Sequence, residues 1–325
     1  MKLDGRRALS WVVLLASIGL ITWFALAHRE DFRLLLELRP MLVVVLVGLQ
    51  VVFLAANALR YLIVLEKCSS RRLQYWYWFR ISVVGMLLNT FFPQSGNVYR
   101  SVLLKQRYEV AYTRYITGYF SLAWMSLCFN LFLALVTLAA VEPHQRLGGL
   151  PALPLLLVML LGCVMVPVAL DRVHRPFVVR IRYLAWLRSK VGEVLRITVE
   201  NLGDGVYMTK NVTLALALFL HNCVLFYLAF LAMGIEVDLA DLVLFYVLLQ
   251  LSVYVVVTPG NLGLQELVFG LVGASLGIGM AEGILVSALV RAAGYLALAI
   301  LAVPLGGMGA LRSVGQYRRM DDAAK

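Results

Sequence analysis

Long apolar runs recur along the chain and predict helices that cross a membrane. About twenty apolar residues suffice, because a helix rises about 1.5 Å per residue and the hydrocarbon core of a bilayer is about 30 Å thick. Runs of this order lie at Leu9–Ala27, Met41–Leu65, Tyr115–Val141, Pro151–Leu170, Val212–Met233 and Ile284–Leu305. The pattern therefore predicts six full spans.

The first run, Leu9–Ala27, also has features of a secretory signal peptide. It follows basic residues and ends with small residues at Ala25 and Ala27. The apolar part of a signal peptide is about 7–15 residues long, and this run is longer. We therefore expect a retained helix.

Two further apolar regions, Ile81–Phe92 and Leu242–Gly279, are broken by Pro, Gly and Asn. The breaks read NTFFPQSGNVYR at Asn89–Arg100 and TPGNLGLQE at Thr258–Glu266. Backbone that is not helical leaves N–H and C=O groups unpaired, and hydrocarbon tolerates this only where protein or a water-filled cavity covers them. We therefore predict that both stretches line a cavity, as the broken helices of transporters do.

The distribution of basic residues predicts which loops are cytoplasmic. Basic residues flank the first broken region on both sides and are frequent in Asp171–Lys210 and after Gly309, whereas His28–Pro40, Glu142–Gly149 and Gly234–Asp241 have no positive excess. The first hairpin should therefore enter from the cytoplasm and the second from outside, with both termini cytoplasmic. Whether the second hairpin crosses fully and returns stays open, because both arrangements leave its flanks outside.

The predicted fold is an all-α, polytopic helical bundle of the membrane, with six full spans and two broken or re-entrant helical hairpins. It is a single domain over residues 1–325, with a membrane core at about 9–309, a cytoplasmic amphipathic loop at 171–210 and a cytoplasmic basic tail at 310–325. In that loop, the spacing of apolar residues predicts an interfacial helix at Phe177–Val199. The aromatic run Tyr75–Phe79 predicts an anchor at the membrane surface.

Composition supports a membrane protein, since 62% of the residues are hydrophobic and the mean hydropathy is +0.86. The net charge of +11 comes largely from loop Lys and Arg residues, which suits membrane orientation and contacts with anionic lipid. Nucleic acid is not an expected partner, because no basic stripe is interleaved with stacking aromatic residues. Four scattered cysteines predict neither a metal site nor a disulfide set: Cys68, Cys128, Cys163 and Cys223.

Charged residues inside apolar segments are the strongest candidates for a site, because a charge near mid-membrane costs about 2.5–3.5 kcal/mol. Glu266 and Arg291 either form a structural pair or take part in a site. Arg100 is either an interfacial residue that snorkels to the surface or a phosphate contact. Four polar residues are better interpreted as links between helices: His221, Asn222, Asn130 and Gln250.

The turn residues have simple structural interpretations when each is taken alone. Pro93 and Pro259 are compatible with turns, while Gly96, Gly260 and Gly263 allow positive φ or close helix contact. Their joint occurrence beside a charge, inside otherwise apolar sequence, is what favours a site.

The two stretches also carry a family resemblance. Their patterns are Asn-x-x-x-Pro-x-x-Gly-x-x-x-Arg and Thr-Pro-Gly-x-Leu-Gly-x-x-Glu. Over about Leu9–Gly309, the chain resembles the flippase-like membrane domain of the lysylphosphatidylglycerol synthase family. The resemblance implies a domain that moves a phospholipid or a polyprenyl-linked lipid between leaflets. It implies substrate-binding residues at Asn89, Pro93, Gly96, Arg100, Pro259, Gly260, Gly263 and Glu266, and the position of Arg291 in the last span adds it to this set.

The chain departs from the family pattern at three positions. Asn97 stands where many members have an acidic residue, Asn261 where a second Gly is frequent, and Gln265 where a basic residue is frequent. Because Asn97 and Gln265 are uncharged, the chemical identity of the lipid headgroup stays open. After Gly309 only a short basic tail follows, so we expect any aminoacyl transfer to reside in a separate lipid-modifying enzyme.

We expect a transporter whose substrate is a membrane lipid with an anionic headgroup. Its phosphate would meet Arg100 and the N–H groups of the Pro93–Gly96 turn, while Glu266 and Arg291 would face its zwitterionic or cationic part, with the tails in the bilayer. The sequence has no P-loop, so transport would be passive, exchange-driven or coupled to an ion or the membrane potential. No cofactor, metal or catalytic residue is expected.

Two alternatives from other classes stay open. One is a membrane enzyme with Glu266 or Asp171 as a base, although the sequence lacks the HEXXH spacing of zinc enzymes. The other is a non-transporting scaffold in lipid or cell-envelope biosynthesis. A short chain with small loops suits a prokaryotic cytoplasmic (inner) membrane, and the sequence does not indicate the lipid, the direction of transport, the energy source or the oligomeric state.

Overall fold

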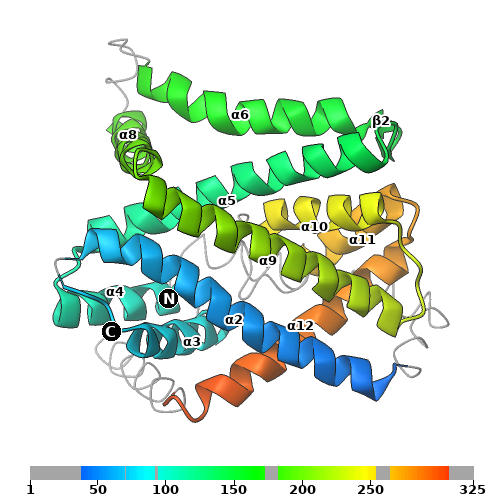
Figure 1. The fold of residues 1–325 in the computed structure, drawn as a ribbon, viewed down its shortest axis with the longest axis horizontal. Coiled ribbons are helices and arrows are strands. Elements are labelled where there is room, and N and C mark those ends of the chain that lie inside the picture. The colour runs from blue at the N-terminus through cyan, green and yellow to red at the C-terminus, as the bar shows by residue number, and fades with distance from the viewer. Residues whose placement is uncertain (1–37, 70, 92–93, 173–181, 254–263, 307–325) are drawn as a thin grey trace, which may run out of the picture.

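The computed structural model describes residues 38–69, 71–91, 94–172, 182–253 and 264–306 (Figure 1). Within these ranges the chain forms ten α-helices and one short β-hairpin. The helices are α2 (Pro40–Cys68), α3 (Tyr75–Phe91), α4 (Ser95–Tyr108), α5 (Tyr112–Val141), α6 (Ala152–Arg172), α8 (Arg182–Leu202), α9 (Gly205–Ala232), α10 (Leu239–Val253), α11 (Leu264–Ser275) and α12 (Met280–Ala302). The hairpin pairs β1 (Arg146–Leu147) with β2 (Leu150–Pro151), antiparallel. The described part of the chain is thus an all-α bundle apart from this one turn.

Four described helices are long and apolar enough to cross a membrane by length and composition, namely α2, α5, α9 and α12. They coincide with four of the predicted spans. A fifth predicted span falls on α6, whose described apolar part, Ala152–Met165, is shorter. The remaining predicted span, Leu9–Ala27, lies outside the described residues. The chain is therefore a multi-pass membrane protein, and the full count of six spans stays a prediction.

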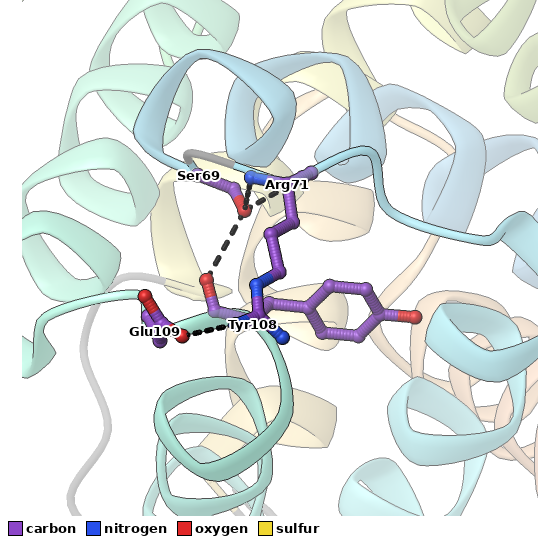
Figure 2. Close-up of polar contacts among 4 residues, drawn as sticks. All are labelled: Ser69, Arg71, Tyr108 and Glu109. Atoms are coloured by element: carbon purple, nitrogen blue, oxygen red, sulfur yellow. Dashed lines mark hydrogen bonds and ion pairs between the residues drawn. The ribbon is translucent and has the colours of Figure 1, made fainter.

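The first broken region forms a hairpin of two short helices, α3 and α4, which pack against each other. Their 17 and 14 residues rise about 26 and 21 Å, less than the thickness of a hydrocarbon core. The entry and exit of the hairpin lie together, as Figure 2 shows. Ser69 Oγ donates to Tyr108 O at 3.3 Å, and Arg71 Nη2 pairs with Glu109 Oε1 at 2.5 Å. The two ends of this hairpin therefore lie together at one end of the bundle, and its entry from the cytoplasm stays a prediction.

The second broken region also forms two short arms, α10 and α11, which pack side by side. Their described 15 and 12 residues rise about 22 and 18 Å. Asp238 and Asp241, at the start of α10, line the same surface hollow as Leu276 and Gly277, just after α11. This hairpin too enters and leaves at one end of the bundle.

Polar contacts gather the predicted cytoplasmic loops at one end of the bundle and the predicted outer loops at the other. At the first end, Lys67 Nζ pairs with Asp204 Oδ2 at 2.8 Å, and Arg71 pairs with Glu109 as Figure 2 shows. At the other end, Gln145 Nε2 donates to Asp241 Oδ1, and the Gly148 N–H donates to Ser275 O at 3.2 Å. The grouping agrees with the one derived from loop charges.

Aromatic rings fill the centre of the packing between α9, α10 and α11. Phe245 contacts Phe226, Phe230 and Phe269 with ring centroids 5.9, 5.1 and 5.5 Å apart. Such pairs contribute about 0.5–1.5 kcal/mol each beyond the area they bury. They hold the second hairpin against the long helix α9.

Two predicted surface elements also make contacts with neighbouring helices. The aromatic run Tyr75–Phe79 is not uniformly an interfacial anchor, because Trp78 is 1% exposed and its Nε1 donates to Ala58 O of α2 at 2.7 Å. The amphipathic helix is present as α8, but it packs against α5 and α6, and its Thr198 hydroxyl bonds to that of Ser121 at 2.5 Å. One face of each element therefore packs against other helices, while Trp76 and Val199 are 76% and 65% exposed, and their placement at the membrane surface stays a prediction.

Candidate functional site

The tip of the first hairpin is closed by a side chain from α3. Asn89 Oδ1 accepts a hydrogen bond of 2.7 Å from the Gly96 N–H, in the first turn of α4. Ser95 Oγ donates to Leu88 O of α3 at 3.0 Å. The first N–H groups of a helix have no partner inside the helix, and hydrocarbon offers none. Asn89 therefore supplies an acceptor for a helix that begins inside the bundle.

The two arms of this hairpin approach each other through glycines. A Cβ atom placed on Gly96 would lie 1.7 Å from Gly85 O, so no other residue fits there without a shift of the backbone. A Cβ atom on Gly85 would lie 2.7 Å from Arg100 Nε. The absence of both side chains is what lets α4 lie directly against α3 and leaves room for the arginine.

Arg100 is held at the inner face of the hairpin. Its side chain is 4% exposed, and its Nε donates to Gly96 O at 3.1 Å. It therefore does not reach the surface, as a snorkelling residue would. Its guanidinium group lines a cavity instead.

The cavity, called the polar cavity below, has a volume of about 290 Å³ and lies among α2, α3, α4, α5, α9 and α10. Its polar lining comes from all six helices: Asn57, Arg60, Tyr61, Asn89, Arg100, Tyr119, Ser126, Asn130, Asn222, Tyr246 and Gln250. Arg60 lies eight residues before the end of α2, about 12 Å along its axis. The cavity thus extends inward from the end of the bundle that has the basic loops.

The charge of the polar cavity is positive. Arg60 and Arg100 are 9% and 4% exposed, and no Asp or Glu is among the described residues that line the cavity. Guanidinium groups in a low-dielectric site bind carboxylate or phosphate strongly and with defined geometry. The amide and hydroxyl side chains around them supply further hydrogen bonds. The arrangement suits a polar anion of small size.

Glu266 and Arg291 form a separate pair between α11 and α12. Glu266 Oε1 and Arg291 Nη1 are 2.9 Å apart, and the two side chains are 12% and 13% exposed. Arg291 also donates to Gln265 Oε1 at 3.0 Å and to Tyr295 OH at 2.7 Å. No described residue of α11 or α12 lines the polar cavity. The geometry therefore favours the structural interpretation of this pair.

Comparison with known families identifies the chain. The family described as the lysylphosphatidylglycerol synthase TM region matches residues 10–302, which is most of the sequence. The chain belongs to this family. No curated protein and no solved structure matches it.

The predicted site residues of this lysylphosphatidylglycerol synthase TM region fall into three groups. Asn89, Gly96 and Arg100 come together at the first hairpin, and Asn89 and Arg100 line the polar cavity. Glu266 and Arg291 form the separate pair. Three residues of the late motif and one of the early motif lie outside the described residues: Pro259, Gly260, Gly263 and Pro93.

Other cavity residues of this TM region were not predicted as a site. Asn222 and Gln250 both donate to Tyr246 OH, at 3.4 and 3.0 Å, and the Asn222 bond links α9 to α10 as predicted. The same side chains also line the polar cavity, together with Asn130. Arg60 was missed because it lies near the end of an apolar run, where a charge is common. Among the described residues, no cluster of His, Cys, Asp or Glu could hold a metal ion.

Proposed function

We propose that this protein is a flippase-like transporter that moves a phospholipid or a polyprenyl-linked lipid between membrane leaflets. The observation that carries the proposal is the polar cavity, which places two buried arginines among helices that cross the membrane. A charged headgroup cannot pass through hydrocarbon at an appreciable rate, so a route for it needs polar groups at this depth. Membership of a lipid-related membrane family supports the same class of substrate.

The phosphate of the lipid would bind between Arg60 and Arg100. Arg100 is confined by its bond to Gly96 O and by the close packing at Gly85, and Arg60 is buried. The surrounding amides and phenols, such as Asn57 and Tyr61, would bind the hydroxyl or amine groups of the headgroup. Charge-assisted hydrogen bonds are about twice as strong as neutral ones, so the arginines would decide affinity and the neutral groups selectivity.

The hairpin tip would provide the moving part. Asn89 and the glycine contact hold α4 against α3 at the cavity wall, and neither helix is long enough to cross a bilayer alone. A small displacement of this hairpin would open the polar cavity toward one leaflet or the other, as broken helices do in transporters. We place the protein in a cytoplasmic (inner) membrane with the basic loops and both termini in the cytoplasm, which lets headgroups enter from the cytoplasmic leaflet.

In this proposal Glu266 and Arg291 stabilise the bundle. The pair ties α11 to α12, and Gln265, where a basic residue is frequent in the family, accepts a hydrogen bond from Arg291. A basic side chain at position 265 would compete with Arg291 for the Glu266 carboxylate. The neutral Gln therefore leaves the pair intact.

Leaflet exchange in liposomes tests the proposal. Purified protein is reconstituted with a trace of fluorescent phosphatidylglycerol, and dithionite is added to bleach the label in the outer leaflet. A transporter makes the inner label accessible as well. Arg100→Gln and Arg60→Gln should slow exchange strongly, because each removes one of the two cavity cations.

The matched control is Arg196→Gln, because Arg196 is an exposed arginine on α8 that pairs with the exposed Glu200. It should exchange lipid as the wild type does. Equal exchange in wild type, Arg60→Gln and Arg100→Gln would refute the proposed site. If the wild type moves neither phosphatidylglycerol nor a polyprenyl phosphate, transport is refuted.

A further inference from the structure

An apolar groove lies beside the polar cavity, between α5, α6, α8 and α9. Its volume is about 500 Å³, within the range of pockets that hold small molecules. Several of its wall residues are open to the outside, including Phe132 at 51% exposed, Leu161 at 51% and Val164 at 38%. The groove is therefore reached from the surface that faces lipid.

The groove and the polar cavity are continuous. Arg60 of α2 and Ala215 of α9 line both of them. Along α9, Asn211 lines the groove, Ala215 lies at the junction, and Leu218 and Asn222 line the cavity. These positions have the spacing of one helix face, so a single stripe of α9 leads from one space into the other.

The groove wall is mostly apolar, and several of its polar groups are bonded to protein. Thr198 Oγ1 donates to Val194 O at 2.8 Å and bonds to Ser121, and Trp124 Nε1 donates to Cys163 O at 2.9 Å. Asn211 Nδ2 donates to Tyr207 O at 3.3 Å. Away from Arg60 and the Asn211 side-chain oxygen, which has no hydrogen-bond partner among the described residues, the wall is apolar and would fit a hydrocarbon chain.

We infer that the groove binds one hydrocarbon tail of the same lipid whose anionic headgroup lies in the polar cavity. The inference rests on the proposed function. If the phosphate of a lipid binds at Arg60, its tail must extend out of the polar cavity. The junction at Arg60 and Ala215 opens directly into an apolar space. The tail therefore leaves the bilayer and packs against α5, α6 and α9, contrary to the expectation that the tails stay in the bilayer.

This placement has a consequence for selectivity. A tail gains no hydrophobic free energy by moving from bilayer to groove, because both are apolar, so binding depends on packing. Filling the groove should weaken binding of a lipid with tails and leave binding of the bare headgroup unchanged.

Thermal unfolding of the purified protein in detergent tests the inference. The two ligands are dioleoyl phosphatidylglycerol and glycerol 1-phosphate, which share the phosphate and differ in the tails. Val164→Trp and Leu161→Trp fill the groove at partly open positions of α6. Val158→Trp is the matched control, because Val158 is 67% exposed on the same helix and does not line the groove.

We expect both groove variants to need about fivefold more phosphatidylglycerol, or more, for the same rise in melting temperature, while the control behaves as the wild type. Glycerol 1-phosphate should act equally on all four proteins. Equal lipid affinity in the wild type and both groove variants would overturn the inference, as would a matching loss of glycerol phosphate binding. If lipid exchange still depends on Arg100 in that case, the proposed function survives the failure of the tail site.

Discussion

Replacement of Gly96 by Ala should separate the arms of the first hairpin. The added Cβ would lie 1.7 Å from Gly85 O, and Cβ atoms are essentially never found closer than 3.0 Å to another heavy atom. The obstacle is backbone, which cannot rotate away as a side chain can. The hairpin must therefore open by roughly 1 Å or more, and Arg100, which donates to Gly96 O, must move with it.

The magnitude follows from two opposing terms. Overpacking costs about 1–3 kcal/mol, and the better helix propensity of Ala returns up to about 1 kcal/mol. Because the clash is with backbone, we expect a net loss of about 2 kcal/mol. At about 2–4 °C per kcal/mol, the melting temperature in detergent should fall by about 4–8 °C.

Two other glycines complete a graded series. Gly48→Ala, on α2, meets nothing within 4 Å and should leave the melting temperature unchanged or slightly raised. Gly85→Ala meets Arg100 Nε at 2.7 Å and Gly96 O at 3.0 Å, and should give an intermediate fall. The assay is thermal unfolding followed by size-exclusion chromatography. A Gly96→Ala protein as stable as Gly48→Ala would refute the close packing of α3 on α4.

Three further predictions concern single contacts. Asn89→Ala should lower the free energy of unfolding by about 0.5–2 kcal/mol, because it removes the acceptor of the Gly96 N–H. Asn89→Asp keeps an acceptor and should lose less. Thermal unfolding of both variants measures the difference. Glu266→Gln should lower the free energy of unfolding by about 3–5 kcal/mol, because it leaves Arg291 with a neutral partner. In a double-mutant cycle, the variant that carries both Glu266→Gln and Arg291→Gln should recover part of this loss. The hydrogen bond from Lys67 lowers the pKa of Asp204 below its ordinary value of 3.8, so the stabilisation is complete above that value and is lost as the pH falls through the folded-state pKa. Melting curves between about pH 5 and pH 3 should therefore fall more steeply for wild type than for Asp204→Asn, and parallel curves would contradict the ion pair.

Length and loop charge were sufficient to predict the long helices and the grouping of their ends. The predicted span Tyr115–Val141 begins three residues after the start of α5, and Met41–Leu65 lies within α2. The first hairpin was predicted to return to its side of entry because both flanks are basic, and the Arg71–Glu109 contact brings those flanks together. These features depend on hydrophobicity and charge, which follow directly from the residue types in the sequence.

The composition of the polar cavity could not be predicted in the same way. The spanning helices are apolar on most faces, so no amphipathic period reveals which side of α2 or α9 faces inward. Arg60, Asn57 and Asn222 come together only through the lateral packing of helices that are far apart in sequence. For the same reason the burial of Trp78 against Ala58 was not visible in an aromatic run. Residues whose role depends on lateral packing need the structure.

Reversible blockage of the polar cavity tests most directly whether lipid headgroups pass through it. Asn130→Cys places a thiol in the cavity wall of a variant whose four native cysteines are replaced, and Glu200→Cys places one on the exposed face of α8. A negatively charged methanethiosulfonate modifies each, and mass spectrometry measures the extent. We predict that modification at position 130 stops leaflet exchange in liposomes, that dithiothreitol restores it, and that modification at position 200 has no effect. Exchange that continues at the wild-type rate with position 130 fully modified would show that lipid takes another path.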